Sequence, residues 1–423
     1  VNSQFRLIGT ERIANTSTVT VRGGGYLDLN GFDETIANLV FNSQGGYRDA
    51  GPLVMTRAGR LTITGNITAT GLDDPRAVPS VGGRLVLPAT TTIQVDQVAG
   101  TRVLGVRGDA NEQVGLALNA VLLGNSTITK TGSGALQLGG VSAANLTVNV
   151  TAGEVVLGAS TGTSASNYRN TQINLSGAGT ILDMRGNTNM QLGSVVSADS
   201  TSVVKNFSQT AATLVTGADG TSGTFAGTLA SEYTTGQLSV TKMGGGTWTL
   251  TGNSSASILS GLTVNNGVVS LNQATGKVGF VTTTLANGGT LTLNSGTVAL
   301  SDRLGGTTSV QSQTADRTFT NRGGTLNYYG AAGVTENLST VTNLAGQGTW
   351  NLFNNDTQSR INIATLSGAS ATNNGSLVLN AGSALLGASA SGTTAAPGAG
   401  RVNVFATASN LVGGGGAAAS KTM

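Results

Sequence analysis

The stretch LTVNNGVVSL, residues 262–271, sets a pattern that recurs along the chain. Three further blocks align with it without a gap: LTLNSGTVAL (291–300), LVLNAGSALL (377–386) and VNVTAGEVVL (148–157). Apolar and other residues alternate on either side of a glycine, which is the period of a strand with one inward face. A sharp bend between short strands needs a positive φ, which glycine adopts without strain. Each block is therefore predicted to be strand, bend, strand, with structural turn glycines at Gly153, Gly267, Gly296 and Gly382.

A second pattern, glycine followed by two apolar residues at alternate positions, recurs through the chain, for example at 25–29, 246–250 and 348–352. Its spacing often falls near multiples of about 22 to 24 residues, as expected of stacked coils with variable loops. An antiparallel sandwich or barrel is the alternative, but hairpins would favour two-residue Asn-Gly loops. Only 5 prolines occur, and helical periodicity is nearly absent. The pattern favours an all-β parallel β-helix, a β-solenoid of roughly 19 coils.

Composition removes most enzyme mechanisms before any motif is considered. The chain has 423 residues with Gly 64, Cys 0 and His 0, and only 10% of residues are charged. Disulfides, thiolate and imidazole catalysis and Cys/His metal sites are excluded, and no cofactor is expected. The net charge is +3, and the basic residues occur singly, so no nucleic-acid partner is expected. No apolar run approaches the roughly 18 to 20 residues of a membrane helix, so no membrane-spanning segment is predicted in this chain.

Two longer segments carry a family resemblance. Residues 128–139 (ITKTGSGALQLG) and 240–253 (VTKMGGGTWTLTGN) share the pattern Thr-Lys-x-Gly-x-Gly-x-Leu/Trp-x-Leu, and the bends at Gly153 and Gly267 follow them. They resemble the autotransporter-associated β-strand repeat, found in the passenger regions of bacterial autotransporters and related giant surface proteins. That resemblance implies export, a right-handed parallel β-helix, and an extracellular or bacterial cell-surface location.

The expected domain organisation is one solenoid over residues 1–387, with repeat blocks near 128–157, 238–271, 285–300 and 375–386. Residues 388–423 are rich in glycine and alanine and form a candidate assembly arm. The ends of a solenoid expose unpaired strand edges, which pair with another chain unless they are capped. Self-association through the ends or the tail, into a homopolymer or lattice, is therefore predicted.

Two acidic pairs are candidates for chemistry. Asp73-Asp74 and Asp33-Glu34 could bind Ca²⁺ or serve a polysaccharide-cleaving site. No further aspartate recurs at the coil spacing beside them, so solvated loop acids are the favoured interpretation. No catalytic or metal-binding residue is assigned.

The remaining motifs favour structural interpretations. The tripeptide Arg107-Gly108-Asp109 is expected by chance in a glycine-rich chain. The glycine runs 23–25 and 244–246 precede no helix and are predicted to be turns rather than phosphate loops. Trp248 and Trp350 occupy equivalent inward positions of the second pattern and are predicted to lie in the core. A sugar-stacking role would require them to be exposed.

Three classes of function follow from these expectations. The leading hypothesis is a non-enzymatic extracellular structural protein, a β-helical stalk or a filament or surface-layer subunit. The second is an adhesin passenger that mediates self-association or attachment to a cell-surface or matrix ligand. The third is a polysaccharide-active enzyme built on the same scaffold.

Overall fold

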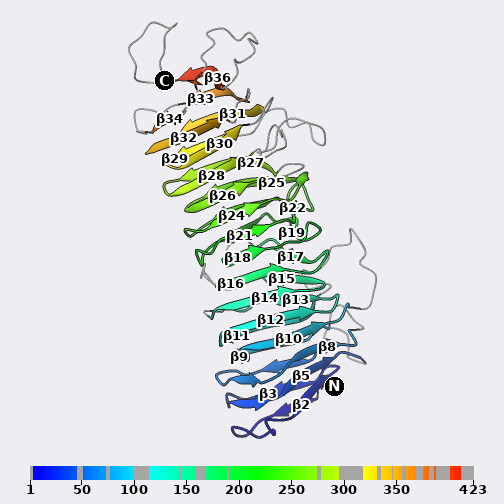
Figure 1. Ribbon diagram of the computed structural model, residues 1–423. Coiled ribbons are helices and arrows are strands. Elements are labelled where there is room, and N and C mark those ends of the chain that lie inside the picture. The colour runs from blue at the N-terminus through cyan, green and yellow to red at the C-terminus, as the bar shows by residue number, and fades with distance from the viewer. Residues whose placement is uncertain are drawn as a thin grey trace. The chain divides into compact units, whose positions relative to one another are not determined.

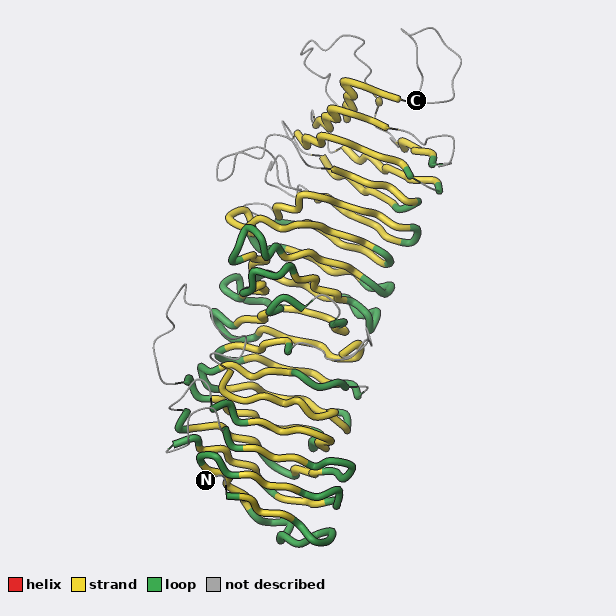
Figure 2. Tube along the Cα trace, turned by 180° about the vertical axis from the view of Figure 1, so that it is seen from behind, coloured by secondary structure: helices red, strands yellow, loops and turns green. Residues whose placement is uncertain are grey.

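The computed structural model describes residues 3–44, 51–72, 77–98, 114–142, 144–158, 168–187, 190–273, 278–294, 318–330, 335–344, 346–354, 359–367, 375–380, 385–386 and 401–410. Within these ranges the regular elements are β-strands and none is a helix, as Figure 1 and Figure 2 show. The chain divides into two compact units, Val1–Asp219 and Gly220–Met423. The all-β prediction is confirmed.

The first unit contains two sheets. Sheet A contains β1 (Gln4–Arg6), β3 (Tyr26–Asp28), β6 (Leu53–Met55), β9 (Ser80–Val86), β11 (Val114–Leu123), β13 (Ala135–Leu138), β15 (Glu154–Leu157), β17 (Ile181–Asp183) and β19 (Val203–Asn206), with β4 (Glu34–Ile36) and β7 (Leu61–Ile63) beside this path. Sheet B contains β2 (Thr18–Arg22), β5 (Asn38–Asn42), β8 (Ile67–Thr70), β10 (Thr90–Val95), β12 (Ser126–Thr131), β14 (Leu146–Val150), β16 (Tyr168–Leu175) and β18 (Leu192–Val196). The short strand β20 (Ala212–Thr216) follows them.

The second unit repeats this plan. Sheet D contains β21 (Gly223–Phe225), β24 (Thr247–Leu250), β26 (Gly267–Leu271), β28 (Gly289–Asn294), β30 (Thr325–Gly330), β32 (Gln347–Asn354) and β34 (Ser376–Asn380). Sheet C contains β23 (Leu238–Lys242), β25 (Ser254–Val264), β27 (Val278–Ala286), β29 (Thr318–Arg322), β31 (Thr335–Asn343), β33 (Ser359–Ser367), β36 (Arg401–Asn410) and β35 (Leu385–Leu386). The strand β22 (Thr228–Ser231) lies between β21 and β23 in the sequence.

Neighbouring strands in these ladders run parallel, and most come from successive passes of the chain. Thr247 lies opposite Val268, and Val268 lies opposite Thr290, so one coil takes 21 or 22 residues here. Elsewhere the step between paired residues ranges from 16 residues, between Leu385 and Arg401, to 43 residues, between Ser359 and Val402. Loops of different length between strands explain why the sequence spacing was irregular.

Each unit is therefore a parallel β-solenoid, as predicted, and the antiparallel sandwich is wrong. One isolated antiparallel bridge joins Ala286 and Gly323. The right-handed winding and the number of coils remain predictions.

The core of each unit consists of inward side chains stacked from coil to coil. In sheet A one such column contains Leu27, Val54, Val81, Leu118 and Leu138, all of which are buried. Each fully buried aliphatic side chain contributes roughly 1.5 to 3 kcal/mol relative to an exposed one. The coils therefore stabilise one another, because a single coil would leave both ends of every column in water.

The two tryptophans lie in the core of the second unit, as predicted. Trp350 is buried and packs edge-on against Phe319, with 5.5 Å between ring centroids. Trp248 is buried beside Phe225 at 6.2 Å. Neither tryptophan can present its face to a sugar.

Candidate functional sites and surfaces

A buried lysine lies at the same corner in both units. The Lys130 ammonium donates hydrogen bonds to the carbonyl oxygens of Thr131, Gly132 and Ala152, at 3.0, 2.7 and 2.9 Å. Lys242 donates in the same way to the carbonyl oxygens of Met243 and Gly244. Both side chains are fully buried. The lysine of the Thr-Lys-x-Gly-x-Gly pattern thus caps carbonyl groups that converge at the bend of the coil.

The environment of Lys130 acts on its charge in two directions. Burial lowers its pKa to about 8, and the nearby Glu154 carboxylate acts in the opposite sense. The three carbonyl contacts also favour the ammonium form, because an ammonium has three donors and no acceptor. The group is therefore mainly protonated at neutral pH, and its donors are occupied by backbone carbonyl oxygens rather than available for catalysis.

The turn glycines pack against the same corner from the next coil. Gly153 and Gly267 have φ values of +73° and +67°. A Cβ on Gly153 would lie 2.5 Å from the Gly134 carbonyl oxygen and 2.7 Å from that of Gly132. A Cβ on Gly267 would meet the equivalent oxygens of Gly244 and Gly246 at 2.4 and 2.5 Å. The predicted turn glycines Gly296 and Gly382 lie outside the described residues.

These contacts explain the spacing of the repeat signature. The lysine and the two glycines of the signature form one corner. The turn glycine of the next coil stacks directly on the carbonyl oxygens of those two glycines. A side chain at the stacked glycine would both clash and strain the backbone. The Thr-Lys-x-Gly-x-Gly pattern and the turn glycine that follows it therefore form one packed structure made by two successive coils.

A buried aspartate, Asp28, was missed by the sequence analysis. It receives hydrogen bonds from the Arg57 guanidinium, Nε to Oδ1 at 2.8 Å and Nη2 to Oδ2 at 2.9 Å. Arg6 lies 3.5 Å away, and Gln4 donates at 3.3 Å. The hydrogen bonds from Arg57 are the main reason that the pKa of Asp28 is lowered. The carboxylate therefore links neighbouring coils at the start of the solenoid through these hydrogen bonds and ion pairs.

The Asp28 turn recurs at Asp183. In both turns the aspartate Oδ1 accepts a hydrogen bond from the backbone N–H two residues later, at Asn30 and Arg185, each at 2.9 Å. Those two residues have positive φ, and a glycine follows each of them. The shared pattern Leu-Asp-x-x-Gly at 27–31 and 182–186 is the sequence signal that could have identified the turn.

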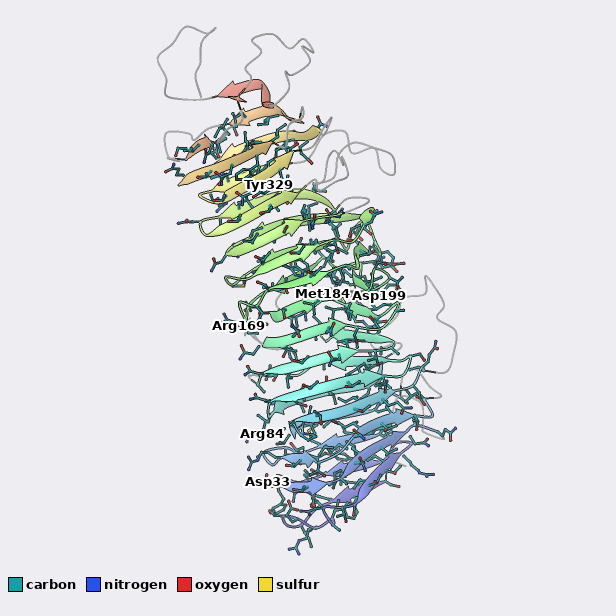
Figure 3. All side chains as sticks on the ribbon, viewed as in Figure 1. Asp33, Arg84, Arg169, Met184, Asp199 and Tyr329 are labelled. Carbon is teal, nitrogen blue, oxygen red and sulfur yellow. The ribbon has the colours of Figure 1, made fainter. Side chains whose placement is uncertain are left out.

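The acidic pair Asp33-Glu34 makes structural contacts. Asp33, labelled in Figure 3, is partly exposed and pairs with Arg60 at 3.1 Å. Hydrogen bonds from Arg60 are the leading cause of its lowered pKa. Glu34 is buried and accepts hydrogen bonds from the backbone N–H groups of Arg12 and Ile13. The prediction of a solvated loop acid is therefore wrong for Glu34, because the carboxylate caps the backbone of the preceding coil.

The other candidate motifs give no binding site among the described residues. Asp73, Asp74 and the tripeptide 107–109 lie outside those residues. Within them, no group of three or more carboxylates lies close enough together to hold a metal ion. Gly23 and Gly244 have positive φ in turns, and no helix follows either glycine run. The residues that the structure describes also contain no helix long and apolar enough to cross a bilayer.

The outward face of sheet D carries a ladder of amides. Asn351 donates to the Asn327 Oδ1 at 2.9 Å, and Asn380 donates to the Asn351 Oδ1 at 3.2 Å. Asn327 donates to the Thr292 hydroxyl at 3.5 Å. Two residues further along these strands, at the next outward position, Tyr329 stacks on Phe353 with 4.5 Å between ring centroids and an interplanar angle of 13°.

The first coil exposes an apolar edge. Phe5 lies opposite Leu27 at the end of the inward column of sheet A, yet it is 59% exposed. Ile8 is 84% exposed. Among the described strands, β1 pairs with β3 alone, so its other edge is unpaired. An unpaired edge beside exposed apolar side chains is suited to pairing with another strand.

Comparison of the chain with protein-family models, with curated proteins and with solved structures found no match. The resemblance to the autotransporter-associated β-strand repeat therefore remains a prediction from the sequence.

Proposed function

We propose that the chain is a non-enzymatic extracellular structural protein, a β-helical stalk or filament subunit, that assembles through its ends. The observation that carries this proposal is the first coil, where Phe5 and Ile8 are exposed beside the unpaired edge of β1. The buried Lys130, Glu34 and Asp28 support the structural role, because they form hydrogen bonds with backbone groups or with a neighbouring arginine.

End-to-end contact is favoured by the chemistry of parallel ladders. Each strand in a solenoid offers N–H and C=O groups along the axis, so a second copy could continue the ladder at β1. The contact would cover Phe5 and complete the column that begins at Leu27. A contact between unlike ends that does not close on itself produces an open fibre.

The experiment compares assembly of the full chain with that of a Phe5→Glu/Ile8→Glu variant. Sedimentation velocity and negative-stain electron microscopy are expected to show fibres or end-joined particles for the parent and fewer or none for the variant. Val141→Glu is the matched control, because Val141 is 40% exposed but lies away from β1. Deleting residues 411–423, which follow β36, separately tests the tail. If the parent is monomeric, or if the edge variant assembles normally, assembly through the β1 edge is disproved.

An adhesin remains the second candidate, supported by a different observation. The outward face of sheet D has a stacked aromatic pair and an amide ladder. A surface-binding assay of purified protein separates the two candidates, because a stalk requires no ligand on its sides.

A further inference from the structure

The outward face of β30, β32 and β34 combines hydrogen-bonding and apolar groups without charge. None of the outward positions on these strands is Asp, Glu, Lys or Arg. The amide ladder runs along the face from Asn327 through Asn351 to Asn380. Phe353 and Val378 are 40% and 38% exposed and lie on either side of the ladder. These two are among the few large apolar residues exposed in the described part of the chain.

The central amide of the ladder, that of Asn351, retains capacity for a ligand. A side-chain amide has two N–H donors and two acceptor lone pairs. Asn351 uses one N–H toward Asn327 and one lone pair toward Asn380. Its second N–H and second lone pair suit a hydroxyl, which can both donate and accept. Because the ladder bonds hold the amides in place, little side-chain entropy is lost when a ligand binds.

The aromatic pair supplies the apolar part of the face. Stacking with Tyr329, labelled in Figure 3, fixes the ring of Phe353 while leaving part of it in contact with solvent. Rigid exposed rings beside fixed polar groups are typical of surfaces that bind amphipathic ligands. A sugar ring has this amphipathic character, with C–H groups on its faces and hydroxyls on its rim.

From this arrangement we propose that the face formed by Asn327, Asn351, Asn380, Tyr329, Phe353 and Val378 binds a neutral polysaccharide chain. Successive coils repeat at about 4.8 Å, close to the length of one sugar residue, so a linear chain can lie along the ladder. The lack of charge favours a neutral polysaccharide over an acidic one, which would call for arginine or lysine. This proposal concerns the outward face of sheet D in the second unit and does not depend on assembly through the β1 edge.

Affinity electrophoresis of the full chain in gels containing laminarin, xyloglucan, dextran or heparin tests the proposal. At least one neutral polysaccharide is expected to retard the protein, and heparin is expected to retard it less. Phe353→Ser is expected to weaken the apparent affinity about tenfold, the loss of one stacking contact. Val378→Ser on the neighbouring strand is expected to weaken it in the same direction, and Phe353→Tyr is expected to retain binding.

Thr284→Ala on sheet C is the matched control and is expected to bind as the parent does. Circular dichroism establishes that each variant keeps its fold. The proposal is overturned if none of the three neutral polysaccharides retards the parent, if heparin alone does, or if Phe353→Ser and Val378→Ser bind normally. If these variants change only self-association, the face belongs to a second copy of the chain. Fibre formation measured on the same variants keeps this result separate from the end-assembly test.

Discussion

Two independent constraints favour glycine at the coil corner, the backbone conformation and the space available for a side chain. Gly153 has a positive φ, and its Cα faces two carbonyl oxygens of the preceding coil. Gly179 has nearly the same backbone conformation, with φ +67°, but no heavy atom lies within 4 Å of the place its Cβ would occupy. Comparison of these two residues separates backbone strain from steric contact.

Gly179→Ala is expected to lower the free energy of unfolding by about 1 to 2 kcal/mol, the cost of a left-handed alanine. Gly153→Ala is expected to lower it by about 3 kcal/mol or more, because the coils must also separate around the new methyl group. Urea unfolding followed by far-UV circular dichroism measures both. Equal losses of unfolding free energy in the two variants would mean that the close carbonyl oxygens at Gly153 add no cost to the substitution.

Strands and corners were predictable from the sequence to different degrees. The alternation of apolar and polar residues predicted strands around Val148, Leu262 and Trp350. This pattern can be recognised within one coil, because an outward residue contacts water whatever the neighbouring coil contains. Burial of Glu34 and Lys130 was not predictable in this way. Their burial depends on the backbone groups of neighbouring coils, some about 20 residues away in the sequence. The alternation within one strand does not reveal which residues of the neighbouring coil lie opposite.

The lysine corner is an element whose stability depends on pH. The folded-state pKa of Lys130 is about 8, below the roughly 10.4 of an unfolded lysine. Below pH 8 both states hold the proton. Between these two values the unfolded state binds more protons than the folded state, so the free energy of unfolding rises with pH.

Lys130→Met is expected to lower the free energy of unfolding by about 1 to 3 kcal/mol at pH 7, because three carbonyl oxygens lose their donor. The difference between parent and variant is expected to grow between pH 8 and 10, since only the parent has the titrating amine. Urea unfolding at pH 7, 8.5 and 9.5 measures this difference. Lys242→Met is the parallel variant in the second unit. A difference that shrinks above pH 8 would contradict the lowered pKa.

At the scale of the whole molecule, in-register stacking accounts for the unusual composition. Each outward position lies directly opposite its equivalent in the next coil, so a charged residue repeated there would face like charge. Threonine avoids this and favours the strand conformation. Sheet C shows the result as a column of Thr263, Thr284, Thr320 and Thr342. The same constraint explains why only 10% of the chain is charged.

The parallel register of successive coils supports every functional argument above, and paired cysteines test it directly. The chain has no cysteine, so introduced pairs report without interference. In the parallel ladder of β12 and β14, Thr127 lies opposite Thr147, and Thr129 lies opposite Asn149. Adjacent parallel positions are about 4.8 Å apart. That separation suits a disulfide, whereas Cα atoms more than about 7 Å apart cannot be bridged.

The measurement is the rate of disulfide formation under mild oxidation in four double-cysteine variants, read as a mobility shift on non-reducing gels. The pairs Thr127→Cys/Thr147→Cys and Thr129→Cys/Asn149→Cys are expected to close rapidly. The crossed pairs Thr127→Cys/Asn149→Cys and Thr129→Cys/Thr147→Cys are expected to close slowly or not at all. Rapid closure of the crossed pairs, with the direct pairs remaining open, would show that these strands run antiparallel and would contradict the solenoid.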